Sequence, residues 1–364
     1  MTDDNGVSRR DFIGGAALTG GILAANGVTA AANSPGNGKR IKVGAIGVGE
    51  FSFWNYSWGD LLAPAGKPAY KGTLGTNIFN MDVTHVWDVN PAKAKAFADI
   101  MGAEPVARYD GMIGKVDAVA FGGYYEVPWQ HRLALPYIEA KIPTFLDRPF
   151  AFCLRDLDGL LDLIAKHGTP VMATDVYEHL YDVTTLRGKL GRLGEITAVH
   201  GTCYGSEYSA LFHIKFMLPK IFGYNVERVS ILTDDPYKST YVLGAWLFAG
   251  GEKQRPFIAS SVLNQGDLYS ITVAGANGFE YARMPWIEPW DRNLIGEHVS
   301  WLVDMQRTFE GKMYEPLDII RKKTQIFLAG LYSASERNGA WVNVGEIPVD
   351  WRARPPMPGW IDEK

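Results

Sequence analysis

The sequence has 364 residues, of which 47% are hydrophobic and 21% are charged, proportions that are ordinary for a globular protein. At roughly 100 to 200 residues per domain, this length predicts two domains or one large one. The 36 Lys and Arg residues against 40 Asp and Glu residues give a net charge of -4, which provides no basic surface for nucleic acid. Composition also excludes disordered, collagen-like and multi-span membrane proteins, and it favours a small or uncharged ligand.

The first 32 residues have the pattern of an export signal. Arg9 and Arg10 precede an apolar stretch at 12–25, which glycines interrupt and which is too short to span a bilayer comfortably. Small residues at 28–32 resemble a cleavage site. We expect residues 1–32 to be a twin-arginine signal peptide, residues 33–39 to be a flexible leader, and the exported protein to be periplasmic and free of the membrane.

A glycine-rich turn follows the first predicted strand. Segment 41–46 alternates and is β-branched, which predicts a buried parallel strand, and residues 47–52 form a GxGxxG-like turn with serine in the third position. Glycine permits the tight turn and the approach of a pyrophosphate, and serine is small enough for close packing of the next helix. The predicted cofactor-binding residues here are Gly47, Gly49, Glu50, Phe51 and Ser52.

A second predicted strand, at 83–87, ends in Asp88 and is followed by a predicted helix at 92–101. Asp88 would accept hydrogen bonds from both ribose hydroxyls and repel a 2′-phosphate, so NAD is expected rather than NADP, which stays possible. Asn90 is included in this predicted cofactor site. Asp88 lies about twice as far beyond the glycines as the usual ~20 residues, because segment 53–80 intervenes. We interpret 53–80 as a lengthened first helix plus a surface excursion.

Further strand and helix patterns alternate along the chain. Strands are predicted at 116–121, 142–146 and 170–173, with a loop at 122–129 and a helix at 130–140. This rhythm predicts an α/β fold with a doubly wound parallel sheet, the Rossmann arrangement. Strand-like runs at 196–203, 257–264 and 269–274 predict a second domain of the α+β class.

Together these motifs resemble the Gfo/Idh/MocA family, which is named for glucose-fructose oxidoreductase, inositol dehydrogenase and rhizopine catabolism. The resemblance is carried by segments 41–49, 86–98, 116–121 with His131, 142–149 and 310–344. It implies a Rossmann domain at 40–151 and a C-terminal α+β domain at 152–345 whose large, open, mainly antiparallel sheet binds substrate and supports a dimer or tetramer, with a tail at 346–364. It also places Tyr124, His131, Asp147 and Arg148 at the cofactor.

Two positions depart from the family pattern. Arg148 stands where the family's Glu-Lys-Pro motif has lysine, and arginine cannot transfer a proton because its pKa lies above ~12. It could still stabilise a developing alkoxide. Where the family has Asp four residues before His, this chain has Ser209 and His213, which would share one face of a helix.

The resemblance and its departures together indicate the catalytic candidates. His213 is the expected general acid or base, and Arg148 is expected near the nicotinamide. Tyr177 and His179, directly after the strand at 170–173, are the reserve proton donors. Cys153 and Cys203 are too few for a disulfide framework, and neither they nor the His and acidic residues have metal-ligand spacing, so no metal site is expected.

Three functions agree with this pattern. The first is an NAD-dependent oxidoreductase that transfers a hydride between nicotinamide and a hydroxyl-bearing carbon of a sugar, cyclitol or polyol. The second is a glycosidase of the same fold that retains NAD, oxidises the sugar transiently and eliminates the aglycone. The third is a sugar-binding protein that has lost catalysis, since both departures remove proton-handling groups.

Overall fold

The computed structural model describes most of the chain from residue 39 onward. The described residues are 39–49, 52–67, 75, 77–123, 126–202, 213–233, 241–248, 257–262, 268–285 and 294–354. The predicted signal peptide and nearly all of the predicted leader lie outside these residues. So do five of the positions singled out above, which are Glu50, Phe51, Tyr124, Cys203 and Ser209.

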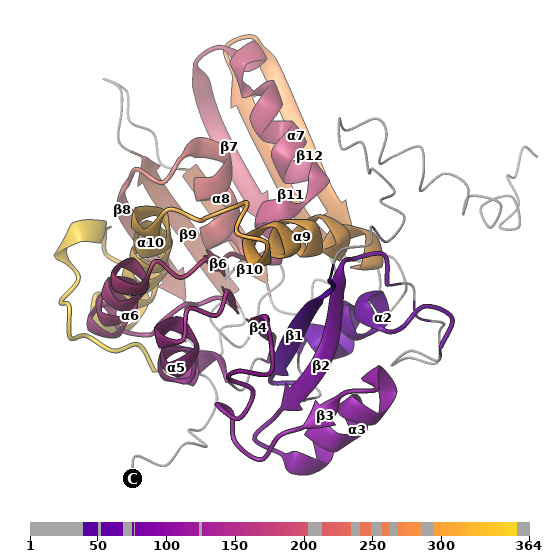
Figure 1. Ribbon diagram of the computed structural model, residues 1–364. Coiled ribbons are helices and arrows are strands. Elements are labelled where there is room, and N and C mark those ends of the chain that lie inside the picture. The colour runs from indigo at the N-terminus through magenta and orange to yellow at the C-terminus, as the bar shows by residue number, and fades with distance from the viewer. Residues whose placement is uncertain are drawn as a thin grey trace, which may run out of the picture. The chain divides into compact units, whose positions relative to one another are not determined.

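The first half of the described chain folds into a parallel sheet (Figure 1). In sheet order, its six described strands are β3 (Glu104–Pro105), β2 (Met81–Trp87), β1 (Ile41–Ile46), β4 (Ala118–Phe121), β5 (Thr144–Leu146) and β6 (Val171–Ala173). All neighbouring pairs are parallel, and an order with the first strand in the middle is that of the Rossmann fold. The predicted doubly wound α/β sheet is confirmed.

Helices connect these parallel strands, as a parallel sheet requires. They are α3 (Pro91–Met101), α4 (Gln130–Leu133), α5 (Leu135–Glu139) and α6 (Leu154–His167). The local sequence explains the ends of α3. The side chain of Asn90 accepts a hydrogen bond from the Ala92 amide, Pro91 occupies the first helical position, and Gly102 ends the helix in a left-handed conformation.

The second half of the described chain builds a sheet of seven described strands. Their order is β12 (Gly278–Pro285), β11 (Leu268–Gly275), β7 (Ile196–Thr202), β10 (Phe257–Val262), β9 (Tyr241–Phe248), β8 (Val226–Thr233) and β13 (Val342–Asn343). Only β7 and β10 pair in parallel, and the other neighbours are antiparallel. The predicted α+β domain with a mainly antiparallel sheet is confirmed.

The remaining long helices belong to this second half. They are α7 (Tyr181–Lys189), α8 (Ile214–Phe222), α9 (Leu294–Phe309) and α10 (Leu317–Glu336), and α10 packs on β8. In β11, Ile271 and Val273 are buried whereas Ser270 and Thr272 are half-buried, the alternation of a sheet with one face on the core. None of the helices in the described ranges has both the length and the apolar character to cross a membrane.

The extent of the parallel sheet and the structure of the inserted segment differ from the sequence-based expectation. The parallel sheet runs past residue 151, where the first domain was expected to end, because β6 pairs with β5 in parallel register. The segment after the glycine turn is not one long helix. It forms a π-helical turn, Trp54–Trp58, and the single turn α2, Gly59–Leu62. These turns are almost entirely buried, so at 53–62 the inserted residues are core rather than a surface excursion.

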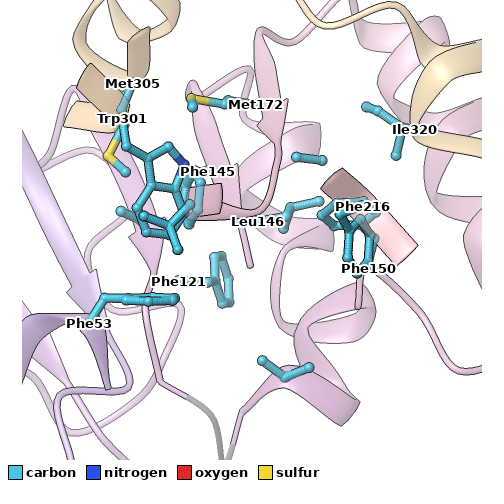
Figure 2. Packing of buried hydrophobic residues seen from close by; sticks show 14 of the residues in the cluster. Phe53, Phe121, Phe145, Leu146, Phe150, Met172, Phe216, Trp301, Met305 and Ile320 are labelled. Carbon is cyan, nitrogen blue, oxygen red and sulfur yellow. The ribbon is translucent and has the colours of Figure 1, made fainter. Parts of the chain in front are cut away.

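An aromatic cluster joins the inserted turn to the parallel sheet and to α9. The ring of Trp58 lies 5.0 Å from Trp54, 5.3 Å from Phe53, 5.3 Å from Phe145 of β5 and 5.0 Å from Trp301 of α9. Figure 2 shows Phe53, Phe145 and Trp301 gathered in this cluster. The contact with Phe53 is stacked and the other three are edge-to-face. Both geometries add to the stabilisation from burial, so the insertion connects α9 to the parallel sheet.

We expect Trp58→Ala to lower the free energy of unfolding by about 3 to 5 kcal/mol, because Trp58 is fully buried and its removal leaves a large cavity. Chemical denaturation of the purified protein measures the change. Phe279→Ala is the control, since Phe279 is 73% exposed and its loss is expected to cost at most about 0.5 kcal/mol. Equal losses in the two variants would contradict the structural role of the cluster.

Candidate functional site

The candidate site lies at the carboxyl ends of neighbouring strands of the parallel sheet. Asp147 and Arg148 follow β5 directly, and Asp175 follows β6 after one intervening residue. Ligands of open α/β sheets bind outside the carboxyl ends of the strands. The sheet therefore brings these three charged side chains to the edge where a ligand is expected.

Arg148 is held between two carboxylates. Its Nη1 donates to Asp147 Oδ1 at 2.7 Å, and its Nε donates to Asp175 Oδ2 at 2.8 Å. The guanidinium also lies 4.7 Å from the centre of the Phe53 ring. Arg148 is only 4% exposed and both aspartates are fully buried. A buried cation needs such hydrogen-bonded partners, because unpaired burial of a charge costs several kcal/mol.

Gln130 of α4 fixes the backbone that carries Arg148. Its Oε1 accepts a hydrogen bond from the Asp147 amide at 3.0 Å, and its Nε2 donates to the carbonyls of Asp147 and Pro149, the latter at 2.8 Å. One buried amide side chain thus satisfies three backbone groups of a segment that no longer belongs to a strand. The position of Arg148 is set by this clamp.

Asp175 joins His213 to Arg148. His213 Nδ1 lies 2.8 Å from Asp175 Oδ2, the same oxygen that accepts from Arg148. The ring of Tyr177 lies 4.2 Å from that of His213. The structure thus brings three of the predicted catalytic residues together around an aspartate that we had not predicted. The signal that could have identified Asp175 is its place after a strand, which it shares with Asp88.

The turn that follows Asp175 holds its carboxylate in place. This 3-10 turn, Val176–His179, begins with a capping box, in which Asp175 Oδ1 accepts from the Tyr177 amide at 2.8 Å and Glu178 Oε1 accepts from the Asp175 amide at 3.0 Å. Reciprocal capping satisfies two backbone donors at once. Asp175 is therefore oriented by its own turn as well as by Arg148 and His213.

Burial and charge set the protonation of the group. Burial raises the pKa of Asp175, but His213, when it is protonated, and Arg148 outweigh this effect and lower the pKa to about 2. Burial lowers the pKa of His213, which Asp175 opposes and Arg148 reinforces. Because the charge of Arg148 already balances Asp175, we assign a neutral imidazole to His213 at neutral pH. A neutral imidazole can accept a proton.

Asp147 is the exception among these acids. Burial raises its pKa to about 7, against the opposing charge of Arg148. Its Oδ1 accepts from Arg148, while its Oδ2 is buried with no hydrogen-bond partner among the described residues. A buried oxygen without a hydrogen-bond partner disfavours the charged carboxylate, so Asp147 takes up a proton far more readily than Asp175 does.

His179 and His131 lie in other pairs. Nδ1 of His179 is 3.1 Å from Asp304 of α9, so this residue pairs with α9 rather than with Asp175. Nε2 of His131 is 3.4 Å from Asp156 of α6, and burial lowers the pKa of His131 to about 4. The structure does not bring either histidine into the group around Asp175.

A buried lysine pairs with Glu178, which in turn binds the backbone of Asp175. Lys323 of α10 lies 2.9 Å from Glu178 Oε2, donates to the Ala173 carbonyl at 3.2 Å, and also pairs with Glu315. Glu178 is the residue whose other oxygen binds the Asp175 amide. Sequence reasoning missed this lysine, because nothing local distinguishes it from the other charged residues of its helix.

The glycine turn and Asp88 form a second group at the end of β1 and β2. Asp88 is 5% exposed. It accepts hydrogen bonds from the amides of Val48 and Gly49, and its Oδ1 accepts from Asn90 at 2.8 Å. Ser52 Oγ donates to the Gly49 carbonyl at 2.7 Å. An oriented acid beside a turn with glycine at positions 47 and 49 fits a dinucleotide, whose ribose hydroxyls would donate to the acid.

Comparison with known proteins agrees with this geometry. The model of the Gfo/Idh/MocA family, described as an oxidoreductase family with an NAD-binding Rossmann fold, matches residues 41–174. No curated protein sequence matches the chain. The segment 41–174 is therefore similar to the NAD-binding Rossmann domain of this family, and NAD is the cofactor that the match supports.

Solved structures share the fold over most of the chain. A myo-inositol dehydrogenase from Lactobacillus casei with NAD(H) and myo-inositol has a TM-score of 0.67 at 13% identity, covering 87% of this chain and 100% of that one. A scyllo-inositol dehydrogenase from the same organism, with NAD(H) and scyllo-inositol, gives 0.67 at 14%, covering 85% and 100%. An oxidoreductase from Agrobacterium radiobacter with NAD+, L-tartaric acid and magnesium gives 0.64 at 16%, covering 84% and 99%.

We expect Asp175→Asn to lower the free energy of unfolding by about 3 to 5 kcal/mol, because it leaves the buried Arg148 with one carboxylate fewer. The pKa of His213 should fall further, since Asp175 is the group that raises it. Denaturation and an NMR titration of the histidines measure both effects. Asp158→Asn is the control, because its pair with Arg321 is about one-third exposed and is worth at most about 1 kcal/mol. Equal losses in both variants would contradict the assignment.

Proposed function

We propose that this protein is an NAD-dependent oxidoreductase that transfers a hydride between nicotinamide and a hydroxyl-bearing carbon of a cyclitol, a polyol or a sugar. The observation that carries the proposal is the group of Arg148, Asp175 and His213 at the carboxyl ends of β5 and β6, in the sheet that binds NAD. Relatives of the same fold that are named as inositol dehydrogenases contain myo-inositol or scyllo-inositol, and they support the substrate class.

NAD, when bound, supplies the hydride acceptor, and the chain supplies the proton acceptor. His213 takes the proton of the substrate hydroxyl onto its imidazole, which is expected to be neutral at neutral pH. Asp175 then stabilises the imidazolium, because its carboxylate already binds Nδ1 at 2.8 Å. This is the arrangement by which an acid holds a catalytic histidine in the required tautomer and orientation.

Arg148 cannot replace the family lysine as a proton carrier, and its contacts indicate a different role. With Nη1 and Nε bound to Asp147 and Asp175, the guanidinium keeps the Asp175 carboxylate charged and fixed. Its positive charge also favours a developing negative charge on the substrate oxygen. In this proposal the proton-handling function moves from the position of Arg148 to the pair of Asp175 and His213.

The cofactor would be held by the turn at the end of β1 and by Asp88. Gly47 permits the tight turn and Gly49 leaves room for the pyrophosphate, while Asp88 accepts from the ribose hydroxyls and Asn90 helps to orient Asp88. Glu50, Phe51 and Tyr124 stay proposed contacts outside the described residues. Asp147 and Arg148 would lie by the nicotinamide, and Tyr177 and His179 are the remaining candidates for proton transfer.

Export of the folded protein forms part of the proposal. A twin-arginine signal at 1–32 would carry the protein with its cofactor to the periplasm, and a tightly held NAD would suit a compartment in which free NAD is scarce. The open second sheet would be covered in a dimer or tetramer, since exposed sheets and their edges otherwise favour aggregation.

We expect His213→Ala to reduce NAD+-dependent oxidation about 100-fold or more, with little change in NAD+ affinity, because general acid-base catalysis contributes on this order. NADH formation with myo-inositol and scyllo-inositol, followed by a panel of sugars and polyols, measures the rate. His167→Ala is the matched control, since His167 lies in the last turn of α6, away from Asp175. Unchanged turnover in His213→Ala would remove His213 from the mechanism.

The same assays separate the other two functions. Release of an aglycone from aryl glycosides without net formation of NADH would favour the glycosidase. Tight binding of a sugar by the protein, with no turnover over the whole panel, would favour the binding protein.

A further inference from the structure

A buried glutamate lies directly beside the glycine turn. Glu126 follows β4 and is 2% exposed. A Cβ built on Gly47 would stand 2.5 Å from Glu126 Oε2 and 2.8 Å from the Cα of Gly123, and a Cβ on Gly123 would meet the same oxygen. The carboxyl group of Glu126 therefore occupies the space that a side chain at either position would need.

The close packing at this contact explains why positions 47 and 123 require glycine, in addition to the geometry of the turn. Gly47 has a φ of 73°, which glycine adopts readily and other residues rarely do. Gly123 does not have this constraint, but a Cβ there would meet the Glu126 carboxyl and would lie 2.6 Å from both the Cα and the carbonyl oxygen of Gly47, so both close approaches require a residue without a side chain. The carboxyl group of Glu126 thus packs directly against the backbone of the glycine turn.

The charges around Glu126 come from two elements. Asp88, after β2, is an acid whose negative charge disfavours ionisation of Glu126, and Lys93 of α3 weakly favours it. The backbone amide of Val89 donates to the Glu126 carboxyl. Burial and Asp88 together raise the pKa of Glu126 to about 8.

Asp88 and Glu126 therefore differ in their tendency to hold a proton. Burial raises the pKa of Asp88, but the hydrogen bonds from the amides of Asn90, Gly49 and Val48 oppose that rise because they stabilise the charged form. Glu126 has fewer such donors and the deeper position. At neutral pH the charge lies on Asp88 and the proton on Glu126.

We propose that Glu126 belongs to the cofactor site and that the dinucleotide binds the form of the protein in which Glu126 is protonated. The inference rests on the proposed function, because it takes the glycine turn to be the place of the pyrophosphate. An ionised Glu126 would add a second negative charge, beside Asp88, to the wall that receives a doubly negative pyrophosphate. A neutral carboxylic acid adds no charge and can donate a hydrogen bond.

The test is the pH dependence of NAD+ binding, measured by titration calorimetry on the full chain between pH 6.5 and 9. If only the protonated form binds, the dissociation constant should rise about tenfold from pH 7 to pH 9 for a group with a pKa of about 8. Glu126→Gln should bind NAD+ at pH 7 about as well as the wild type and show a flat profile. Glu104→Gln is the matched control, because Glu104 is an exposed acid of β3, and it should keep the wild-type profile.

A second measurement needs no variant. Binding at pH 8, repeated in two buffers of different ionisation enthalpy, counts the protons exchanged. The wild type should take up about half a proton for each NAD+ bound, because about half of the free protein has an ionised Glu126 at that pH.

The outcomes separate this inference from the proposed function. NAD+ binding with a flat wild-type profile and no proton uptake would overturn the role of Glu126 and leave the oxidoreductase proposal intact. An equally steep profile in Glu126→Gln would overturn it as well, by assigning the effect to another group. A wild-type protein that binds no NAD+ at any pH would refute both.

Discussion

The Asp175 carboxylate is the interaction on which the rest of the candidate site depends. One of its oxygens receives both Arg148 Nε and His213 Nδ1, each at 2.8 Å, and the other receives the Tyr177 amide. These partners come from the end of β5, from the residue that precedes α8 and from the turn after β6. Without Asp175 the guanidinium of Arg148 would lose a partner and the imidazole of His213 would lose its orientation. The same residue thus determines both the stability and the geometry of the site.

Two buried cations surround the end of β6, and each is paired with two carboxylates. Arg148 lies between Asp147 and Asp175, and Lys323 lies between Glu178 and Glu315. The capping box links the two sets, since Asp175 begins the turn that Glu178 closes. Buried ion pairs are weak evidence for stability, because desolvation offsets their attraction. The two linked sets of ion pairs are therefore better explained by a need to fix the position of Asp175 than by a gain in stability.

The sequence predicts the scaffold of this site better than its contacts. The pattern of β1 and the acid after β2 are local signals, and they led to the parallel sheet and to Asp88. The pairing of Asp175 with His213 joins residues that are 38 positions apart, and that of Ala173 with Lys323 joins residues that are 150 apart. No local periodicity reports such partners. The expected sharing of one helix face by Ser209 and His213 stays a prediction, because Ser209 lies outside the described residues.

Arg148, which stands where the resemblance leads us to expect lysine, has a physical explanation that does not require loss of the proposed function. A lysine at this position could share its single ammonium group among the acids and could lose a proton, whereas arginine keeps its charge and spreads it over several donors. Its Nη1 and Nε reach two carboxylates at once. With a permanent cation in this place, Asp175 stays charged over the physiological pH range. An arginine here is therefore compatible with the proposed mechanism, in which His213, joined to Arg148 through Asp175, exchanges the proton.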